Sequence, residues 1–125
     1  MDGCVFMRYE DLMVWQKGIK LVKAIYNETN IFPSDERFGL ISQMRRAAVS
    51  IPSNIAEGHG RKATKAYINH LYIAFGSLME LETLLKISSE LNYLSISHSS
   101  KLLLQCHEVA RMLNGLIISL RKNNT

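Results

Sequence analysis

The stretch that decides the fold is residues 64–91, TKAYINHLYIAFGSLMELETLLKISSEL, which contains no proline and one glycine. Apolar or small side chains recur along it every three or four residues, the spacing that places side chains on one face of an α-helix. This spacing predicts one long helix with a continuous apolar row. The row consists of Leu71, Ala74, Leu78, Leu81, Leu85 and Ser88.

A second apolar row lies beside the first on the same predicted helix. Its members are Ile68, Tyr72, Phe75 and Met79. Two adjacent rows give a wider apolar surface than a monomeric bundle needs. Either this helix is central and well buried, or the second row packs against another subunit, and the pattern favours neither. The four residues are therefore a candidate oligomer interface.

Three further helices are predicted from the same spacing. One covers residues 10–28, one carries apolar residues from position 41 to 55, and one follows a turn near 92–95. Pro52 interrupts the second helix without shifting its apolar row, so we expect a kink instead of a break. The segment Gly58-His59-Gly60 should end that helix. The expected apolar rows are Leu12, Trp15, Ile19, Val22 and Tyr26; Ile41, Met44, Ala48, Ile51 and Ile55; and Leu102, Cys106, Val109, Leu113, Leu116 and Leu120.

Short connections force neighbouring helices to run antiparallel, so the expected fold is an all-α, up-and-down four-helix bundle. Ser34 or Asp35 is expected to cap the second helix, and Ser95 or Ser97 the last. A chain of 125 residues fits one domain. We expect an N-terminal extension over residues 1–8, the bundle over 9–122 and a frayed tail over 123–125.

The composition is that of an ordinary globular protein, with 47% hydrophobic and 21% charged residues. No apolar run approaches the ~20 residues that cross a bilayer, and no secretory signal is evident. Cys4 and Cys106 are too few and too distant to form a disulfide framework. We therefore expect a cytoplasmic protein with no membrane partner. The net charge of +4 favours contact with polyanions without requiring it.

Three segments together resemble a known family: residues 9–17, YEDLMVWQK; residues 39–58, GLISQMRRAAVSIPSNIAEG; and residues 74–85, AFGSLMELETLL. The chain is similar there to the four-helix bundle proteins encoded in intervening sequences of bacterial 23S rRNA genes, also called S23 ribosomal proteins. The resemblance is clear over about residues 7–94. It implies a four-helix bundle that assembles as a ring-shaped homopentamer. The architecture is also similar to the accessory protein of diversity-generating retroelements, which binds nucleic acid and a reverse transcriptase.

A polar stripe follows the second helix at spacings of four, four and three residues: Arg46, Ser50, Asn54 and Glu57. In an antiparallel hairpin that turns near residue 60, Arg46 lies opposite Glu80. One interpretation is structural: an ion pair and hydrogen bonds that fix the register between helices or subunits. The other is functional: Arg45 and Arg46 bind phosphate, since a guanidinium matches phosphate bidentately.

A basic cluster lies at the turn between the second and third helices and consists of Arg61, Lys62 and Lys65, next to His59. In a ring this cluster would repeat in every subunit and form a basic rim suited to phosphate backbones. The alternative is a solvated loop. Tyr67 could stack on a base or pack against the core. A second basic strip, Lys17, Lys20 and Lys23, is expected to be a solvated helix face.

No constellation typical of catalysis is present in the sequence. No glutamate is followed three residues later by histidine, as di-iron bundles require, and no phosphate-binding glycine loop is found. We therefore expect no enzyme activity, no cofactor, no metal and no small-molecule substrate. The sequence predicts a homo-oligomeric bundle, pentameric by resemblance, that binds RNA or DNA through Arg45, Arg46, Arg61, Lys62 and Lys65. The alternative is a protein-interaction scaffold or accessory subunit.

Overall fold

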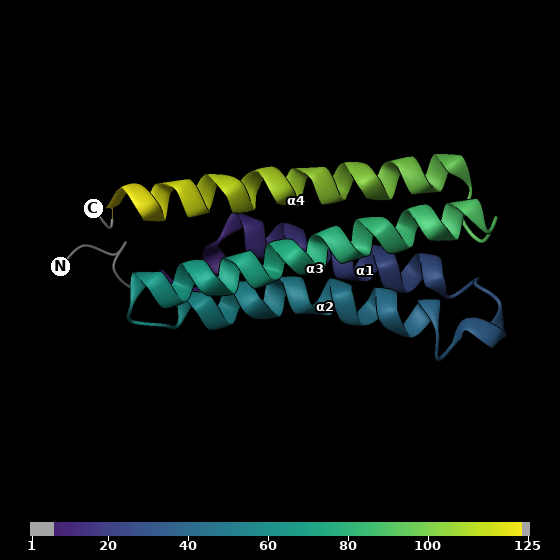
Figure 1. Cartoon of the computed structure of the whole chain (residues 1–125), viewed down its shortest axis with the longest axis horizontal. Helices are drawn as coiled ribbons and strands as arrows, with labels where there is room; N and C mark the ends of the chain where they lie inside the picture. The colour runs from purple at the N-terminus through teal and green to yellow at the C-terminus, as the bar shows by residue number, and fades with distance from the viewer. Residues whose placement is uncertain (1–6, 124–125) are drawn as a thin grey trace.

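The computed structural model describes residues 7–123 and consists of helices in an up-down-up-down arrangement (Figure 1). The order is η2 (Tyr9–Asp11), α1 (Met13–Thr29), η3 (Ser34–Glu36), α2 (Leu40–His59), α3 (Thr64–Glu90) and α4 (Ile96–Asn123). Each long helix contacts two neighbours, because α1 packs on α2 and α4, and α3 packs on α2 and α4. The predicted all-α four-helix fold is confirmed. The expected extension and tail lie largely outside the described residues, as does Cys4.

The first apolar row of α3 forms the centre of the core, as predicted. All six of its members are fully buried: Leu71, Ala74, Leu78, Leu81, Leu85 and Ser88. The hydroxyl of Ser88 is satisfied because it donates to the carbonyl oxygen of Leu84 at 2.8 Å. The second row is divided in the single chain. Ile68 is buried and Phe75 packs partly against the core, whereas Tyr72 and Met79 remain 43% and 37% exposed.

The predicted apolar row of α2 is also confirmed, with Ile41, Met44, Ala48, Ile51 and Ile55 buried. The helix runs without a break through Pro52 and ends at His59. The proline ring is buried where α1 approaches closely, since a Cβ atom added at Gly18 would lie 3.5 Å from the Cβ of Pro52. Packing against α1 therefore supports this position, although proline cannot donate a backbone hydrogen bond there.

The predicted apolar row of α1 is wrong, because the buried side of the helix is rotated about the helix axis relative to that row. The buried side of this helix consists of Val14, Gly18, Leu21, Ile25 and Thr29. The residues expected there, Leu12, Trp15, Ile19, Val22 and Tyr26, lie at its edge and are half-buried or exposed. Two of the buried residues are not hydrophobic, so apolar spacing does not predict their burial. Gly18 has no side chain and lets α2 pack close to α1, and the Thr29 hydroxyl donates to the carbonyl oxygen of Ile25 at 2.7 Å. The helix also begins at Met13, after a short 3-10 turn, and not at Glu10.

The row on α4 is right for its first four residues and wrong at its end. Leu102, Cys106, Val109 and Leu113 are buried, but the next buried residue is Ile117, and the predicted Leu116 and Leu120 are only half-buried. A straight helix drifts relative to a strict 3-4 alternation by ~20° every seven residues. Two successive steps of four, from Val109 to Leu113 to Ile117, correct that drift.

The capping predictions have opposite outcomes. The hydroxyl of Ser95 accepts the backbone N–H of His98 at 3.1 Å, so Ser95 caps α4 as predicted. Ser34 and Asp35 do not cap α2, because they belong to η3 and α2 begins only at Leu40. There the carboxylate of Glu36 accepts the backbone N–H of Leu40 at 3.2 Å. Glu36 therefore provides the capping acceptor of α2 that was predicted for Ser34 or Asp35.

Candidate nucleic-acid interface

The predicted basic cluster is exposed at one end of the bundle, which we call the basic end. Arg61 and Lys62 lie in the turn between α2 and α3, and Lys65 lies in the first turn of α3. Among residues 7–123, none of the three side chains has an ion-pair partner. Ala63 precedes α3 and provides no side-chain cap. The positive end of the α3 dipole therefore adds to the charge of these residues.

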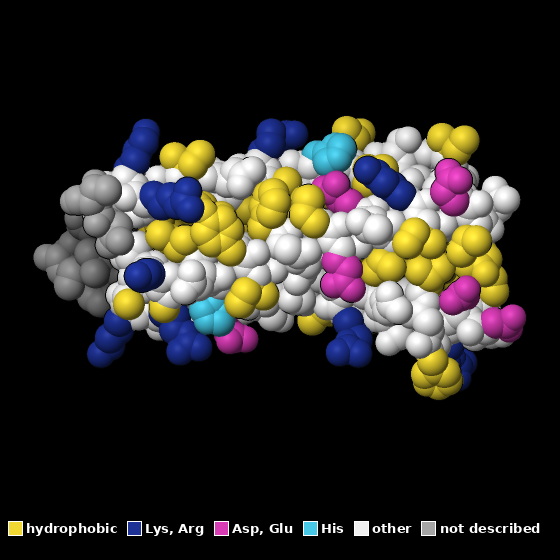
Figure 2. All heavy atoms as spheres, viewed as in Figure 1, with side chains coloured by type: hydrophobic (Ala, Val, Ile, Leu, Met, Phe, Trp, Pro, Cys, Tyr) yellow, Lys and Arg dark blue, Asp and Glu magenta, His cyan; other side chains and the backbone are white. Residues whose placement is uncertain are grey.

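The basic end continues onto α4, whose C-terminus lies at the same end of the bundle (Figure 1). Residues 58–79 and 109–125 contain no Asp or Glu. The antiparallel packing of α3 on α4 brings these two segments together. On the face drawn in Figure 2, several Lys and Arg side chains gather at this end, and most of the visible Asp and Glu side chains lie away from it. The cations of the two segments are Arg61, Lys62, Lys65, Arg111, Arg121 and Lys122.

One of these cations is held in place by an aromatic residue of the second apolar row. The guanidinium of Arg121 lies over the ring of Tyr72, 5.3 Å from its centroid, and donates to the Tyr72 hydroxyl. Lys65 lies seven residues before Tyr72, which places both on the same face of α3. Tyr72, predicted as an oligomer contact, therefore also belongs to the basic surface.

Tyr67 packs and does not present a stacking platform. Its ring lies partly buried against the core and meets the His59 ring edge-on at 5.8 Å between centroids. Burial raises the pKa of its hydroxyl to about 12. Of the two alternatives for Tyr67, the structure supports packing.

Arg45 and Arg46, both predicted as phosphate ligands, have different environments. Arg45 clamps the C-terminus of α1: its Nε donates to the Thr29 hydroxyl at 2.9 Å and its Nη2 to the Asn30 side-chain oxygen at 3.1 Å. Arg46 is exposed. It lines a hollow of about 370 Å³ together with Glu80, so the predicted register is right. Within the described part of the chain the two form no ion pair, so the single chain does not support an Arg46–Glu80 pair between helices, and a pair between subunits stays an interpretation.

The rest of the polar stripe forms a hydrogen-bonded chain across the α2–α3 interface. The Ser50 and Ser77 hydroxyls lie 2.8 Å apart, and the Asn54 amide donates to the Ser50 hydroxyl at 3.0 Å. The Asn54 side-chain oxygen lies 3.0 Å from Nδ1 of His70. Glu57 is exposed outside this chain. Sequence reasoning missed Ser77 and His70, although the register that pairs residue 46 with 80 also pairs 50 with 76 or 77.

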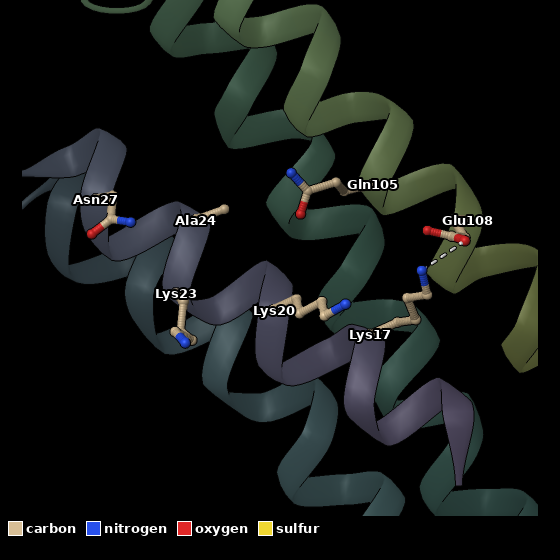
Figure 3. Close-up of a pocket in the computed structure, with 7 residues that line it drawn as sticks. All are labelled: Lys17, Lys20, Lys23, Ala24, Asn27, Gln105 and Glu108. Atoms are coloured by element: carbon tan, nitrogen blue, oxygen red, sulfur yellow. Dashed lines mark ion pairs between the residues drawn. The ribbon is translucent and has the colours of Figure 1, made fainter.

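The lysine strip of α1 is not only a solvated face. Lys17, Lys20 and Lys23 line a hollow of about 430 Å³ between α1 and α4 (Figure 3). Lys17 pairs with Glu108 across it at 3.3 Å. Figure 3 shows Gln105 on the opposite wall, extending toward α1.

Comparison with known proteins identifies the family. The family model for the 23S rRNA-intervening sequence protein matches residues 10–115, most of the chain. The chain belongs to this family. The structure is also similar to a crystal structure of a protein of unknown function from the S23 ribosomal protein family of Bacteroides thetaiotaomicron VPI-5482. The TM-score is 0.78 at 23% identity, with 84% of this chain and 98% of that chain covered. No curated protein matches the sequence.

Over residues 7–123, no three His, Cys, Asp or Glu side chains are placed to hold a metal ion. Cys106 is buried, and burial, with a smaller effect of Glu82, raises its thiol pKa to about 12. Such a thiol stays protonated at neutral pH and is a poor nucleophile. No helix in the same range is long and apolar enough to cross a membrane.

Proposed function

We propose that this member of the 23S rRNA-intervening sequence protein family is a non-catalytic protein that binds RNA or DNA through its basic end. One observation supports the proposal above all others. The turn between α2 and α3 and the first turn of α3 carry Arg61, Lys62 and Lys65, and the last turn of α4 carries Arg121 and Lys122. These segments contain no Asp or Glu, and they lie at one end of the bundle. Folding does not explain this separation of charges. Lys65 lies at the positive end of the α3 dipole, where a cation lowers the stability of the helix.

The chemistry of such a surface is contact with phosphate. Lysine and arginine side chains release counterions when they neutralise phosphates, so affinity falls steeply with salt. Arg61, Lys62 and Lys65 are exposed and lack carboxylate partners within the described residues, so they lose no internal ion pair on binding. Among the described aromatic residues near them, Tyr67 is packed against the core, and Tyr72, although 43% exposed, already has the Arg121 guanidinium over its ring. Contact at this end is therefore with the backbone and independent of base sequence.

The test compares binding of a fluorescent RNA hairpin at about 50 and about 200 mM salt. The variant Arg61→Ala/Lys62→Ala/Lys65→Ala should lose most of the affinity and most of the salt dependence. The matched control is Lys17→Ala/Lys20→Ala/Lys23→Ala, which removes the same charge from the α1–α4 hollow. The control should bind nearly as wild type does, if position matters more than net charge.

Other outcomes contradict the proposal in distinct ways. Equal losses in both triple variants would mean that net charge alone governs binding. A loss confined to the Lys17, Lys20 and Lys23 variant would move the site to the hollow between α1 and α4. No binding of wild type at the lower salt would overturn the proposal.

We further propose that the chain is a homo-oligomer, a pentamer by family resemblance, in which the basic end repeats. Tyr72 and Met79, from the second apolar row, remain exposed in the single chain. The same observation favours a second candidate, a protein-interaction scaffold in which this face binds a partner protein. Light scattering of wild type and Met79→Glu separates them: a charge there should dissociate an oligomer that uses this face. A monomeric wild type that binds no RNA would favour the scaffold.

A further inference from the structure

A groove between the end of α1 and the first half of α2 has a composition different from that of the basic end. Its volume is about 600 Å³. Three arginines line it, together with two aromatic residues, and no Asp or Glu does. The lining residues are Tyr26, Arg37, Phe38, Ile41, Ser42, Arg45, Arg46, Val49 and Ser50. We call it the arginine–aromatic groove.

One wall of the groove is fixed by hydrogen bonds. Arg45 lies over the Tyr26 ring, 4.4 Å from its centroid, and donates to Thr29 and Asn30. Its donors are therefore largely engaged, and it contributes charge and a rigid surface. Arg37 and Arg46 are exposed, and within the described residues neither has an ion-pair partner. These two guanidinium groups are available for a ligand.

Phe38 is the feature that folding does not explain. It lies in the turn before α2 and is 90% exposed, more than any other large apolar side chain in the described chain. An exposed ring costs solvation free energy, since a buried phenylalanine gains about 1.5–3 kcal/mol relative to an exposed one. An open ring beside unpaired arginines is the combination that single-strand-binding proteins use, with stacked bases and neutralised phosphates.

We propose that the arginine–aromatic groove binds an unpaired segment of a single-stranded nucleic acid. A base stacks on Phe38, and Arg37 and Arg46 hold the adjoining phosphates. This inference rests on the proposed function and deepens it. The basic end would contact the phosphate backbone of any nucleic acid. The groove, which starts at the opposite end of α2, would select unpaired bases.

An acidic peptide fits the groove less well. The backbone groups of α1 and α2 are bonded within their own helices, so no free edge is offered to an extended peptide. Hot-spot side chains of a docked protein fill desolvated pockets. Phe38 lies at the open edge of the groove and is 90% exposed, so its ring is not in a desolvated pocket and offers a flat face that suits a base.

The test uses a fluorescein-labelled uridine strand of about 12 nucleotides and an abasic strand of equal length. Wild type should bind the uridine strand about tenfold more tightly, the fold-change expected for one base–aromatic stack. Phe38→Ala should remove that preference, and Phe38→Trp should keep it. Arg37→Ala and Arg46→Ala should each reduce the salt slope by about 0.7, the value for one phosphate of a single strand.

The matched control is Ile31→Ala, because Ile31 is 73% exposed in the same connection but does not line the groove. It should leave the preference for bases unchanged. Thermal unfolding of Phe38→Ala should match that of wild type, since the ring is exposed. A loss of the preference for bases in this variant would then not result from unfolding.

The two proposals fail separately. An unchanged base preference in Phe38→Ala, with hairpin binding lost in the Arg61, Lys62 and Lys65 variant, would overturn the groove and leave the proposed function standing. No binding of either strand or of the hairpin by wild type would overturn both. An acidic, leucine-containing peptide that binds wild type but not Phe38→Ala, while the uridine strand binds both equally, would assign the groove to a protein partner and overturn the inference.

Discussion

The interface between α2 and α3 and the one between α1 and α4 are built differently, although both join antiparallel helices of the same bundle. At the first, a Cβ atom on Gly58 would lie 2.8 Å from the Cβ of His70, so the helices nearly touch. A hydrogen-bonded chain through Ser50 and Asn54 also crosses it. At the second, a hollow of about 430 Å³ separates the helices, and the ion pair between Lys17 and Glu108 spans it.

The difference indicates which part of the molecule secures the fold. Close packing and satisfied polar groups make the α2–α3 hairpin sensitive to a single atom. Exposed ion pairs contribute about 0–1 kcal/mol, so the α1–α4 side can vary its charges at little cost. We therefore expect substitutions along the hairpin to change stability, and substitutions along the α1–α4 hollow to change binding at most.

The largest effect is expected at Leu78, which is fully buried next to the Ser50–Ser77 contact. Leu78→Ala should lower the free energy of unfolding by about 2–5 kcal/mol, the range for deleting a buried leucine side chain. Leu104 on α4 is 67% exposed and serves as the control. Leu104→Ala should change stability by less than about 0.5 kcal/mol. Urea unfolding of both variants measures the difference, and equal effects would contradict the comparison.

The next largest effect is expected at Gly58. An alanine methyl group there would lie 2.8 Å from the Cβ of His70 and 2.9 Å from the Tyr67 ring, closer than real Cβ contacts allow, and a tight 3.2 Å from the Tyr67 carbonyl oxygen. Gly58→Ala should cost about 1–3 kcal/mol, as overpacking does. At Gly18 the nearest atoms are in ordinary contact at 3.5 Å, so Gly18→Ala should cost less. A neutral Gly58→Ala in thermal unfolding would show that α2 and α3 can separate freely.

A smaller effect is expected from the polar chain. Asn54→Ala removes the bonds to Ser50 and His70 and leaves the partly buried Nδ1 of His70 without its Asn54 partner, while the Ser50 hydroxyl keeps its contact with Ser77. The expected loss is about 1–3 kcal/mol. The comparison variant is Lys17→Ala, which breaks only the partly exposed pair with Glu108 and should cost about 1 kcal/mol or less. If Lys17→Ala proves the more damaging in denaturant titration, the polar chain does not stabilise the hairpin.

The sequence predicted the parts of the fold that depend on apolar periodicity. The row of α2 and the first row of α3 carry large apolar side chains at regular spacing, and both are buried as expected. On α1 the buried row includes Gly18 and Thr29, whose roles depend on Pro52 and on a backbone carbonyl. Those partners exist only once the helices are packed, whereas periodicity alone favours the more apolar neighbouring row.

The candidate sites were predictable to the extent that they are local in sequence. Arg61, Lys62 and Lys65 lie within five residues, and their exposure follows from the turn. Their union with Arg121 depends on the antiparallel packing of α4, and the groove that includes Phe38 depends on the angle at which η3 leads into α2. Arg45 and Arg46 are adjacent on a helix and so point about 100° apart, which gave them different environments.

The smallest effect is expected at Gly76, and it tests where assembly takes place. Apart from its chain neighbours and the adjacent backbone of its own helix, no described atom lies within 4 Å of a Cβ added there, so alanine within α3 meets no clash. Gly76→Ala should stabilise an isolated chain by about 0.5–1 kcal/mol through helix propensity. Tyr72 and Met79 flank it on the same exposed face, at spacings of four and three residues. If a second copy covers this face, the added methyl group meets that copy, and stability should then fall and depend on protein concentration. Thermal unfolding at two concentrations distinguishes the cases: a concentration-independent gain would place the oligomer contact elsewhere on the bundle.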